Sequence, residues 1–150
     1  KLKAVVTQNI DGLHQAAGSK RVLKLHGNWT RLECTGCGAR STIDDFDEAR
    51  AGRVPHCPSC SAVVRPDIVF YGEALDPATL EGAVLAIAGA DMLIVGGTSL
   101  AVYPAAGLID YYQGGRLVLM NATPTPYDGR ADLIIREPIG RVFAQIQGHV

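Results

Sequence analysis

Residues 4–14 read Ala-Val-Val-Thr-Gln-Asn-Ile-Asp-Gly-Leu-His, so that an apolar run passes directly into a cluster of polar residues. Similar apolar runs, separated by segments with helical spacing, follow at residues 22–25, 92–95, 117–120 and 133–135. This alternation is typical of an α/β fold with a mostly parallel sheet. Because open sheets of this kind bind ligands beyond the carboxyl ends of their strands, residues 7–14 are a candidate site. A helix start capped by Asn9 or Asp11 is the alternative interpretation.

Two segments show clear helical spacing. Asp76-Pro77 is typical of an N-cap followed by the first helical residue. Apolar residues then follow on one predicted face, namely Leu80, Val84, Ile87 and Ala88. After Pro138 a second amphipathic pattern predicts a last helix that packs on the core through Ile139, Val142, Phe143 and Ile146.

The composition excludes several classes of function. The chain has 150 residues, of which 47% are hydrophobic, and a formal net charge of −1. These values favour a folded domain and argue against a nucleic-acid-binding protein. The longest apolar stretch, residues 83–90, ends at Asp91, well short of the roughly 18 residues that a membrane span needs. No signal-like segment opens the chain, so we expect a cytoplasmic protein. Because the chain starts in a strand pattern without Met, we expect it to be the carboxyl-terminal part of a longer protein.

Residues 28–63 break the alternation of strands and helices. This segment holds all four cysteines and few large apolar residues. We interpret it as a module inserted into the α/β part, which consists of residues 1–27 and 64–150. A segment of this size cannot bury enough apolar surface to fold alone, and it therefore needs a metal or disulfides.

The cysteines form two C-x2-C pairs, Cys34 with Cys37 and Cys57 with Cys60, separated by 19 residues. This spacing predicts a four-thiolate zinc site, and because four thiolates leave no position for water, the zinc should be structural. Two disulfides are the weaker alternative for a chain without a secretion signal. Four reduced core cysteines are disfavoured because their sequence neighbours are polar. His56 adjoins the second pair and is expected to be a surface residue.

Three more predicted strands end in polar or small residues. The strand at 22–25 runs into His26-Gly27, the strand at 92–95 into Gly96-Gly97-Thr98-Ser99, and the strand at 117–120 into Asn121. Histidine titrates near neutral pH, and Gly27 would let backbone and ligand approach closely. The amides of a Gly-rich turn can hold phosphate or ribose. Four polar strand ends together favour a nucleotide site.

These motifs together resemble those of the sirtuins, which are NAD-dependent protein lysine deacylases. The resemblance covers the chain in order and rests on residues 7–14, Leu25-His26-Gly27, the two cysteine pairs, Arg65-Pro66-Asp67-Ile68-Val69-Phe70-Tyr71-Gly72-Glu73, and Gly97-Thr98-Ser99-Leu100 continued by Val102-Tyr103-Pro104. The run at 97–106 is similar to bacterial members. The resemblance implies a Rossmann-like, mostly parallel sheet with an inserted zinc-ribbon module.

The resemblance also implies roles for individual residues. His26 would be the general base that takes a proton from a ribose hydroxyl of NAD. The pocket for nicotinamide and its ribose would be lined by Gln8, Asn9 and Asp11. The rest of the dinucleotide would be held by Gly97, Thr98, Ser99 and Asn121. An acyl-lysine tunnel wall, and one side of a cleft that pairs with the substrate backbone, would be formed by Val69, Phe70, Tyr71, Gly72 and Glu73. Across the substrate they would be faced by Val102 and Tyr103.

The implied reaction transfers the acyl group of an acylated lysine, in a protein or peptide, to ADP-ribose with release of nicotinamide. Such an enzyme is a transferase. Tunnel walls such as Val69 and Phe70 would keep water away from the reacting ribose carbon. Of the other histidines, His14 and His149 lack a position at a strand end.

One family feature has no counterpart in this sequence. Sirtuins carry, ahead of these motifs, a Gly-Ala-Gly-type loop for the NAD pyrophosphate and a flexible cofactor loop. We therefore expect these 150 residues alone to be inactive, and the residues that select the acyl group to lie upstream. The sequence does not predict an oligomeric state.

Two other functions stay open. The first is a noncatalytic NAD-binding protein of the same fold. The second is a zinc-ribbon interaction module, although a nucleic-acid-binding ribbon should carry a basic, aromatic surface. This segment carries acidic residues instead, at Asp44, Asp45, Asp47 and Glu48.

Overall fold

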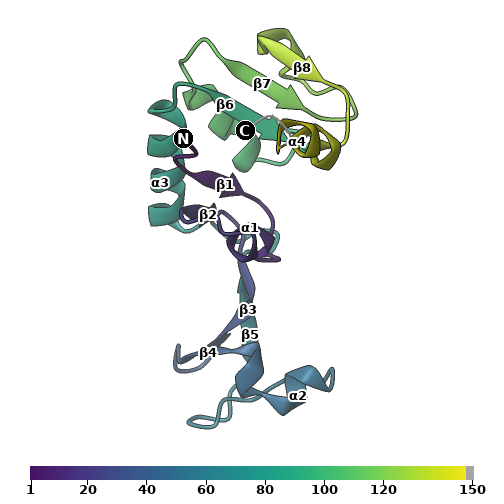
Figure 1. Cartoon of the computed structure of the whole chain (residues 1–150). Coiled ribbons are helices and arrows are strands. Elements are labelled where there is room, and N and C mark those ends of the chain that lie inside the picture. The colour runs from purple at the N-terminus through teal and green to yellow at the C-terminus, as the bar shows by residue number, and fades with distance from the viewer. Residues whose placement is uncertain (148–150) are drawn as a thin grey trace. The chain divides into compact units, whose positions relative to one another are not determined.

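The computed structural model describes residues 1–147 and divides the chain into two compact units, residues 1–80 and the part from residue 81 onward (Figure 1). The elements of the first unit are β1 (Val5–Thr7), α1 (Leu13–Ala16), β2 (Val22–Lys24), β3 (Gly27–Cys34), β4 (Arg40–Thr42), the 3-10 helix η1 (Ile43–Asp45), α2 (Asp47–Arg50) and β5 (Val64–Ile68). Helix α3 (Pro77–Ala88) begins in the first unit and ends in the second. The second unit continues with β6 (Leu93–Gly96), η2 (Ala105–Tyr111), β7 (Leu117–Met120), η3 (Asp128–Arg130), β8 (Leu133–Ile135) and α4 (Ile139–Gln147).

Strands β1 and β2 pair in parallel and place two predicted strand ends at one edge. Val5 lies opposite Val22, and Thr7 lies opposite Lys24. The amide of Leu25 donates to the carbonyl of Thr7 at 2.9 Å, which extends the pairing by one residue. The polar residues that follow both strands therefore leave the sheet side by side.

The cysteine segment forms its own antiparallel sheet in the order β4-β3-β5. Its small core contains Leu32, Phe46 and Val64 together with Cys34 and Cys57. The sequence neighbours of these two cysteines are polar, but in space both are buried among apolar side chains. Pairing of the strands brings apolar side chains from distant positions around them, which the adjacent residues do not reveal.

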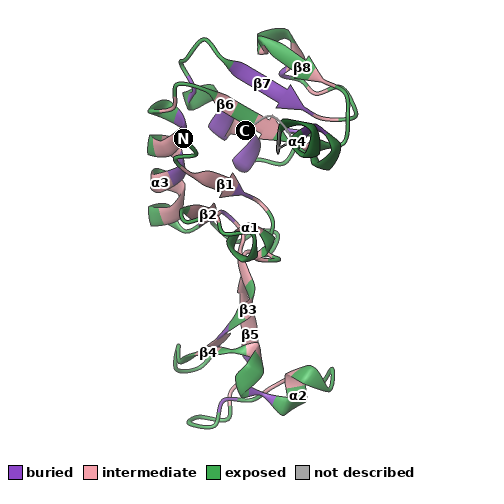
Figure 2. Ribbon diagram, viewed as in Figure 1, coloured by how far each residue is buried: buried purple, intermediate pink, exposed green. Residues whose placement is uncertain are grey.

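The second unit is built on a parallel sheet in the order β6-β7-β8. All four residues of the central strand β7 are buried, as Figure 2 shows in purple. Val118 and Met120 of this strand pack with Val142 of α4. Strands were predicted at residues 92–95, 117–120 and 133–135, and they form within one residue of these bounds because each is a short apolar run, although only β7 is fully buried.

Helix α3 starts as predicted. The carboxylate of Asp76 accepts hydrogen bonds from the amide and the hydroxyl of Thr79, both at 2.7 Å, and so caps the helix that Pro77 opens. The predicted buried face is partly wrong, because Ala88 is exposed and Ala83 is buried instead. Ala83 lies between Leu80 and Ile87 on the helix surface, whereas Ala88 is the last helical residue and lies at the margin of that face.

The last helix buries less than its pattern predicted. Of the four apolar residues, only Val142 is buried; Ile139, Phe143 and Ile146 are between 37% and 47% exposed. Val142 packs with Val118 and Met120 of β7, and Ile139 lies against Gly96 at the end of β6 although it is partly exposed.

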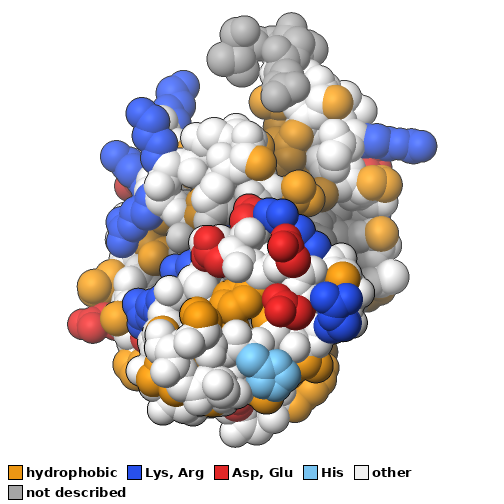
Figure 3. All heavy atoms as spheres, turned by 90° about the horizontal axis from the view of Figure 1, so that it is seen from below, with side chains coloured by type: hydrophobic (Ala, Val, Ile, Leu, Met, Phe, Trp, Pro, Cys, Tyr) orange, Lys and Arg blue, Asp and Glu red, His pale blue; other side chains and the backbone are white. Residues whose placement is uncertain are grey.

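The surface of the described residues can be compared with what a membrane or a nucleic acid would require. Within residues 1–147, no helix is both long and apolar enough to cross a membrane. In the acidic part of the cysteine segment, Arg50 pairs with Asp44 at 3.1 Å and with Asp47 at 3.7 Å. On the face drawn in Figure 3, acidic and basic side chains are interspersed.

Candidate functional site

The four cysteines converge on one point. Their sulfur atoms all lie within 4.8 Å of one another, with Cys34 Sγ 3.4 Å from Cys60 Sγ and Cys37 Sγ 3.7 Å from Cys57 Sγ. A zinc ion at about 2.3 Å from each of four tetrahedral thiolates places the sulfurs about 3.8 Å apart. The sulfur separations therefore fit zinc, and they are far longer than the roughly 2.05 Å of a disulfide.

Tight turns supply amide donors to this centre. The amides of Gly36 and Cys37 donate to Cys34 Sγ at 3.4 and 3.5 Å. A Cβ on Gly36 would lie 2.7 Å from the Cβ of Ala62, so only glycine fits there. His56 is exposed, as predicted.

The protonation of the thiols favours a cation among them. The amides of Cys37 and Gly36 lower the pKa of the Cys34 thiol to about 6. The Ala62 amide lowers the pKa of Cys60, but the sulfurs of Cys34 and Cys37 outweigh it and raise that pKa to about 12. Four sulfurs this close to one another hold protons between them unless a metal ion replaces those protons.

His26 is held at the edge formed by β1 and β2. Its Nδ1 lies 3.0 Å from the backbone oxygen of Gln8, and because a carbonyl only accepts, Nδ1 carries the proton and donates it. The neutral ring then has its lone pair on Nε2, for which the described residues provide no hydrogen-bond partner. Two residues predicted from different strands are thus brought into direct contact.

Gly27 allows two strands to approach each other. It has a φ of 78°, and a Cβ on it would lie 2.1 Å from the backbone oxygen of Asp67 in β5. Strand β5 fills the space at the Cβ position of Gly27, and the approach of a ligand to the backbone there stays a prediction. The same pairing lets the amide of Val69 donate to the carbonyl of His26 at 3.1 Å. Val69, the first residue of the segment predicted to bind substrate, is therefore hydrogen-bonded to the backbone of the predicted base, His26.

An ion pair fixes the conformation of residues 69–73. Arg65 donates to the two oxygens of Glu73 at 2.8 and 2.9 Å, and Glu73 also accepts from the amide of Phe70 at 2.9 Å. The guanidinium lies 4.7 Å from the centre of the Phe70 ring. The Arg65 guanidinium and the Phe70 amide together hold the pKa of Glu73 at about 2. Glu73 was predicted to bind substrate, but its oxygens are engaged within this segment.

Sequence reasoning missed the part that Arg65 plays. Arg65 was quoted only as the first residue of a motif, and the turn that brings it to Glu73, eight positions later, is visible only in the structure. The aromatic residues that this pair frames remain available to a ligand: Phe70 is half exposed and Tyr71 is fully exposed. Gly72 has a φ of 87° and forms the turn between Tyr71 and Glu73.

Some polar groups of the residues after β1 make local hydrogen bonds, and others have no hydrogen-bond partner among the described residues. Asp11 Oδ1 accepts from the amide of Leu13 at 2.9 Å in a local turn. The alternative of a helix capped by Asn9 or Asp11 was wrong, because the N-cap of α1 is Gly12 and no side chain caps this helix. The amide of Asn9 donates to the hydroxyl of Thr7 at 3.0 Å. No described residue makes a hydrogen bond to Asp11 Oδ2 or to the side chain of Asn9, and both lie in the same unit as His26.

The other predicted cofactor residues lie in the second unit. Gly97, Thr98 and Ser99 follow β6, and Asn121 follows β7. The amide of Gly97 donates to the carbonyl of Met120 at 3.0 Å, which ties the two strand ends together. Gly97 has a φ of 65° and open space where a Cβ would stand. That space permits a ligand to approach the backbone.

Val102 and Tyr103 also belong to the second unit. Both are exposed, and the hydroxyl of Tyr103 lies 3.5 Å from that of Tyr127, which in turn donates to Asp110 at 3.3 Å. That Val102 and Tyr103 face residues 69–73 across a substrate remains a prediction. His149, which the sequence analysis set aside, lies outside the described residues.

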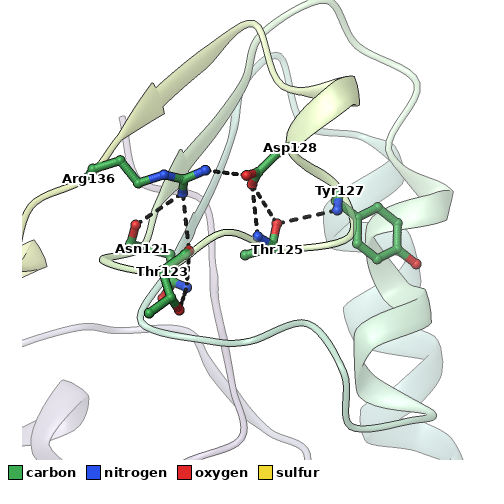
Figure 4. A network of polar contacts seen from close by, with 6 residues as sticks. All are labelled: Asn121, Thr123, Thr125, Tyr127, Asp128 and Arg136. Atoms are coloured by element: carbon green, nitrogen blue, oxygen red, sulfur yellow. Dashed lines mark hydrogen bonds and ion pairs between the residues drawn. The ribbon is translucent and has the colours of Figure 1, made fainter.

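A network of polar contacts holds the loop after Asn121 (Figure 4). Arg136 donates through Nη1 to the carbonyls of Asn121 and Thr123, at 3.1 and 3.2 Å, and pairs through Nη2 with Asp128. Asp128 accepts from the amide and the hydroxyl of Thr125 at 3.2 and 2.8 Å. Arg136 becomes a neighbour of Asn121 only when β8 pairs with β7, so the sequence alone did not indicate it.

Comparisons with known proteins bear on this arrangement. A family model described as the Sir2 family matches residues 1–104. The NAD-dependent protein deacetylase of Clostridium acetobutylicum is 50% identical over 146 residues, which are 97% of this chain and 59% of the relative. The deacetylase of the same name from Clostridium perfringens is 51% identical over 147 residues, again 97% of this chain and 59% of the relative. The chain thus spans about 59% of the length of these curated relatives.

Solved structures agree with these matches. The structure of a Sir2 protein with a p53 peptide and NAD+ aligns with a TM-score of 0.91 and 40% identity, covering 99% of this chain and 63% of that one. A Sir2 protein bound to an acetylated peptide aligns with a TM-score of 0.91 and 39% identity, over 99% and 63% of the two chains.

Proposed function

Because the chain belongs to the Sir2 family, we propose that the full-length protein is an NAD-dependent protein lysine deacetylase. Its substrates are acylated lysines in proteins or peptides, and the acyl group passes to ADP-ribose as nicotinamide is released. The curated relatives carry the name of this activity, and similar Sir2 structures hold NAD+ or an acetylated peptide. When bound, NAD supplies the ribose carbon to which the acyl oxygen transfers.

The observation that carries the proposal is the setting of His26. A general base must present a lone pair, and the bond from Nδ1 to the Gln8 carbonyl leaves that lone pair on Nε2. On its other side the carbonyl of His26 accepts the amide of Val69. His26 is therefore tied to one segment predicted to bind nicotinamide and to another predicted to bind acyl-lysine. In our proposal, Nε2 takes a proton from a ribose hydroxyl of NAD.

The residues around His26 support the binding roles that we propose. The side chains of Gln8, Asn9 and Asp11 follow β1 in the unit of His26 and would hold the nicotinamide and its ribose. In the second unit, the remainder of the dinucleotide would be held by Gly97, Thr98, Ser99 and Asn121. The open space over Gly97 supports the approach of a ligand to the backbone there.

The substrate would lie along residues 69–73. The ion pair of Arg65 with Glu73 holds this segment in one conformation, so that Val69, Phe70, Tyr71 and Gly72 offer their backbone and apolar side chains to an extended peptide. Val102 and Tyr103 would form the opposite side. Recognition through the main chain gives affinity with little dependence on the neighbouring side chains of the substrate.

We also propose that the metal is structural zinc and that the module spans residues 28–63. The four sulfurs occupy all tetrahedral positions, so no site for a reactive water remains. We propose a cytoplasmic location as well, because cysteines that bind a metal rather than form disulfides are typical of a reducing compartment. Cell fractionation would check this location.

The direct test is an assay of the full-length protein with NAD and an acetyl-lysine peptide. We expect one nicotinamide released for each peptide deacetylated, and no release with the unacetylated peptide. A noncatalytic NAD-binding protein would bind NAD in calorimetry and release no nicotinamide, which would refute the proposed activity. A panel of acetyl, succinyl and longer acyl peptides would then define the preferred acyl group.

A further inference from the structure

Arg136 contacts the loop between Asn121 and Asp128 at three points. Its Nη1 donates to the carbonyls of Asn121 and Thr123, and its Nη2 pairs with Asp128 (Figure 4). The planar guanidinium can serve all three acceptors at once because its N–H groups lie in a fixed fork. Both ends of the loop are thereby tied to the residue that follows β8.

The orientation of the Asn121 amide follows from these bonds. Asn121 Nδ2 donates to the carbonyl of Thr123 at 2.9 Å and to its hydroxyl oxygen at 3.2 Å. A carbonyl can only accept, so the nitrogen of the amide must face Thr123 and the oxygen, Oδ1, must face the other way. No described residue makes a hydrogen bond to Oδ1. The group that Asn121 offers to a ligand is therefore an acceptor.

Arg136 holds the oxygen atom on which this orientation depends. The carbonyl of Thr123 receives both Nδ2 of Asn121 and Nη1 of Arg136. Asp128 is fixed in turn, because Thr125 donates to it through both its hydroxyl and its amide. These bonds and the charge of Arg136 lower the pKa of Asp128, which keeps the carboxylate charged. The guanidinium thus pairs with the charged carboxylate of Asp128 on one side and binds the turn at Asn121 on the other.

We propose that Arg136 is a positioning residue for the dinucleotide: it fixes the turn at Asn121 so that Asn121 Oδ1 accepts a hydrogen bond from the bound nucleotide. This inference rests on the proposed function, in which Asn121 holds NAD. Arg136 acts through Asn121 and does not itself touch the nucleotide. Its removal should therefore weaken NAD binding and leave the affinity for acyl-peptide unchanged.

A double-mutant cycle on the full-length protein tests the inference. The variants are Arg136→Gln, Asn121→Ala and the two combined, with calorimetry for the Kd of NAD and steady-state kinetics for the KM of an acetyl-lysine peptide. We expect Arg136→Gln to raise the Kd of NAD about tenfold, with no further rise when Asn121 is already alanine, because the two act as one unit. Arg136→Lys keeps the charge but lacks the fork, so it should restore only part of the affinity.

The control is Arg116→Gln. Arg116 is also an exposed arginine, and it precedes β7, at the end of that strand opposite to Asn121. It should leave the Kd unchanged. The inference would be overturned if Arg136→Gln left the Kd of NAD unchanged. It would also be overturned if Arg136→Gln raised that Kd by the same factor in the Asn121→Ala variant as in the wild type. A parallel loss of Tm, peptide affinity and NAD affinity in both Arg136 variants would show a merely structural role. If the wild-type protein binds no NAD, the proposed function itself fails.

Discussion

The cysteine centre and the edge around His26 are built in different ways. In the centre, Gly36 and Cys37 donate to a sulfur two or three positions away, and every sulfur faces another. At the edge, His26 is bound by Gln8, 18 positions away, and by Val69 beyond the whole cysteine segment, while no residue among 1–147 makes a hydrogen bond to Nε2. A closed centre stabilises the fold, and an open edge keeps a reactive group available. Substitutions in the first should therefore cost structure, and those in the second should cost activity.

Loss of the metal should have the largest effect. We expect native mass spectrometry to find one zinc per chain, and Cys57→Ser or chelation to unfold the module, since binding of structural zinc contributes on the order of 10 kcal/mol. Circular dichroism and zinc content would be measured together. Ser59→Ala, between the second pair of cysteines, is the matched control and should keep both. Protein purified under reducing conditions with two disulfides and no metal would contradict the prediction.

Substitution of the base should affect only chemistry. We expect His26→Ala to lower turnover by roughly 10²-fold or more, the scale of a general base, while Tm and the Kd of NAD change little. His56→Ala is the control, because this exposed histidine adjoins the metal ligand Cys57 and should leave turnover unchanged. Near-normal turnover in His26→Ala would assign the base to another residue.

A charge at Val69, in the proposed wall of the acyl-lysine tunnel, should change the KM for acyl-peptide and not the KM for NAD. Val69→Asp places a carboxylate at a partly buried position beside His26, where loss of hydration is costly. We expect the KM for acyl-peptide to rise about tenfold and the KM for NAD to stay nearly constant. Val69→Ala is the neutral control and should show a smaller rise. If Tm falls and both constants are lost together, Val69 is a core residue.

The same contrast explains which features the sequence revealed. Local patterns were sufficient for the apolar strands, for the cap at Asp76 and for the cysteine pairs, because each depends on residues within a few positions. The buried neighbours of Cys34, the close approach of Gly27 to Asp67 and the bonds of Arg136 depend on strand pairing. Such contacts join residues whose spacing in the sequence carries no periodic signal.

The last helix, α4, also shows that a local pattern predicts an element better than its burial. Its amphipathic pattern correctly predicted a helix over residues 139–146. The pattern shows which face is apolar, but how much of that face is buried depends on which elements pack against it. Val142 therefore packs on β7, whereas Phe143 and Ile146 stay partly exposed.

The smallest effect should come from Glu73, which stabilises the open edge without taking part in chemistry. Its pKa is about 2 in the folded protein, against an ordinary value of 4.5, because Arg65 and the Phe70 amide favour the carboxylate. Between these values the unfolded chain binds more protons than the folded one, so stability should decrease as the pH falls from about 4.5 to about 2. Glu73→Gln removes this titration, and its thermal unfolding should depend less on pH over that range. Glu81→Gln, an exposed acid of α3, is the control and should keep the wild-type slope. Identical slopes for Glu73→Gln and wild type would show that the ion pair with Arg65 does not hold residues 69–73 in place.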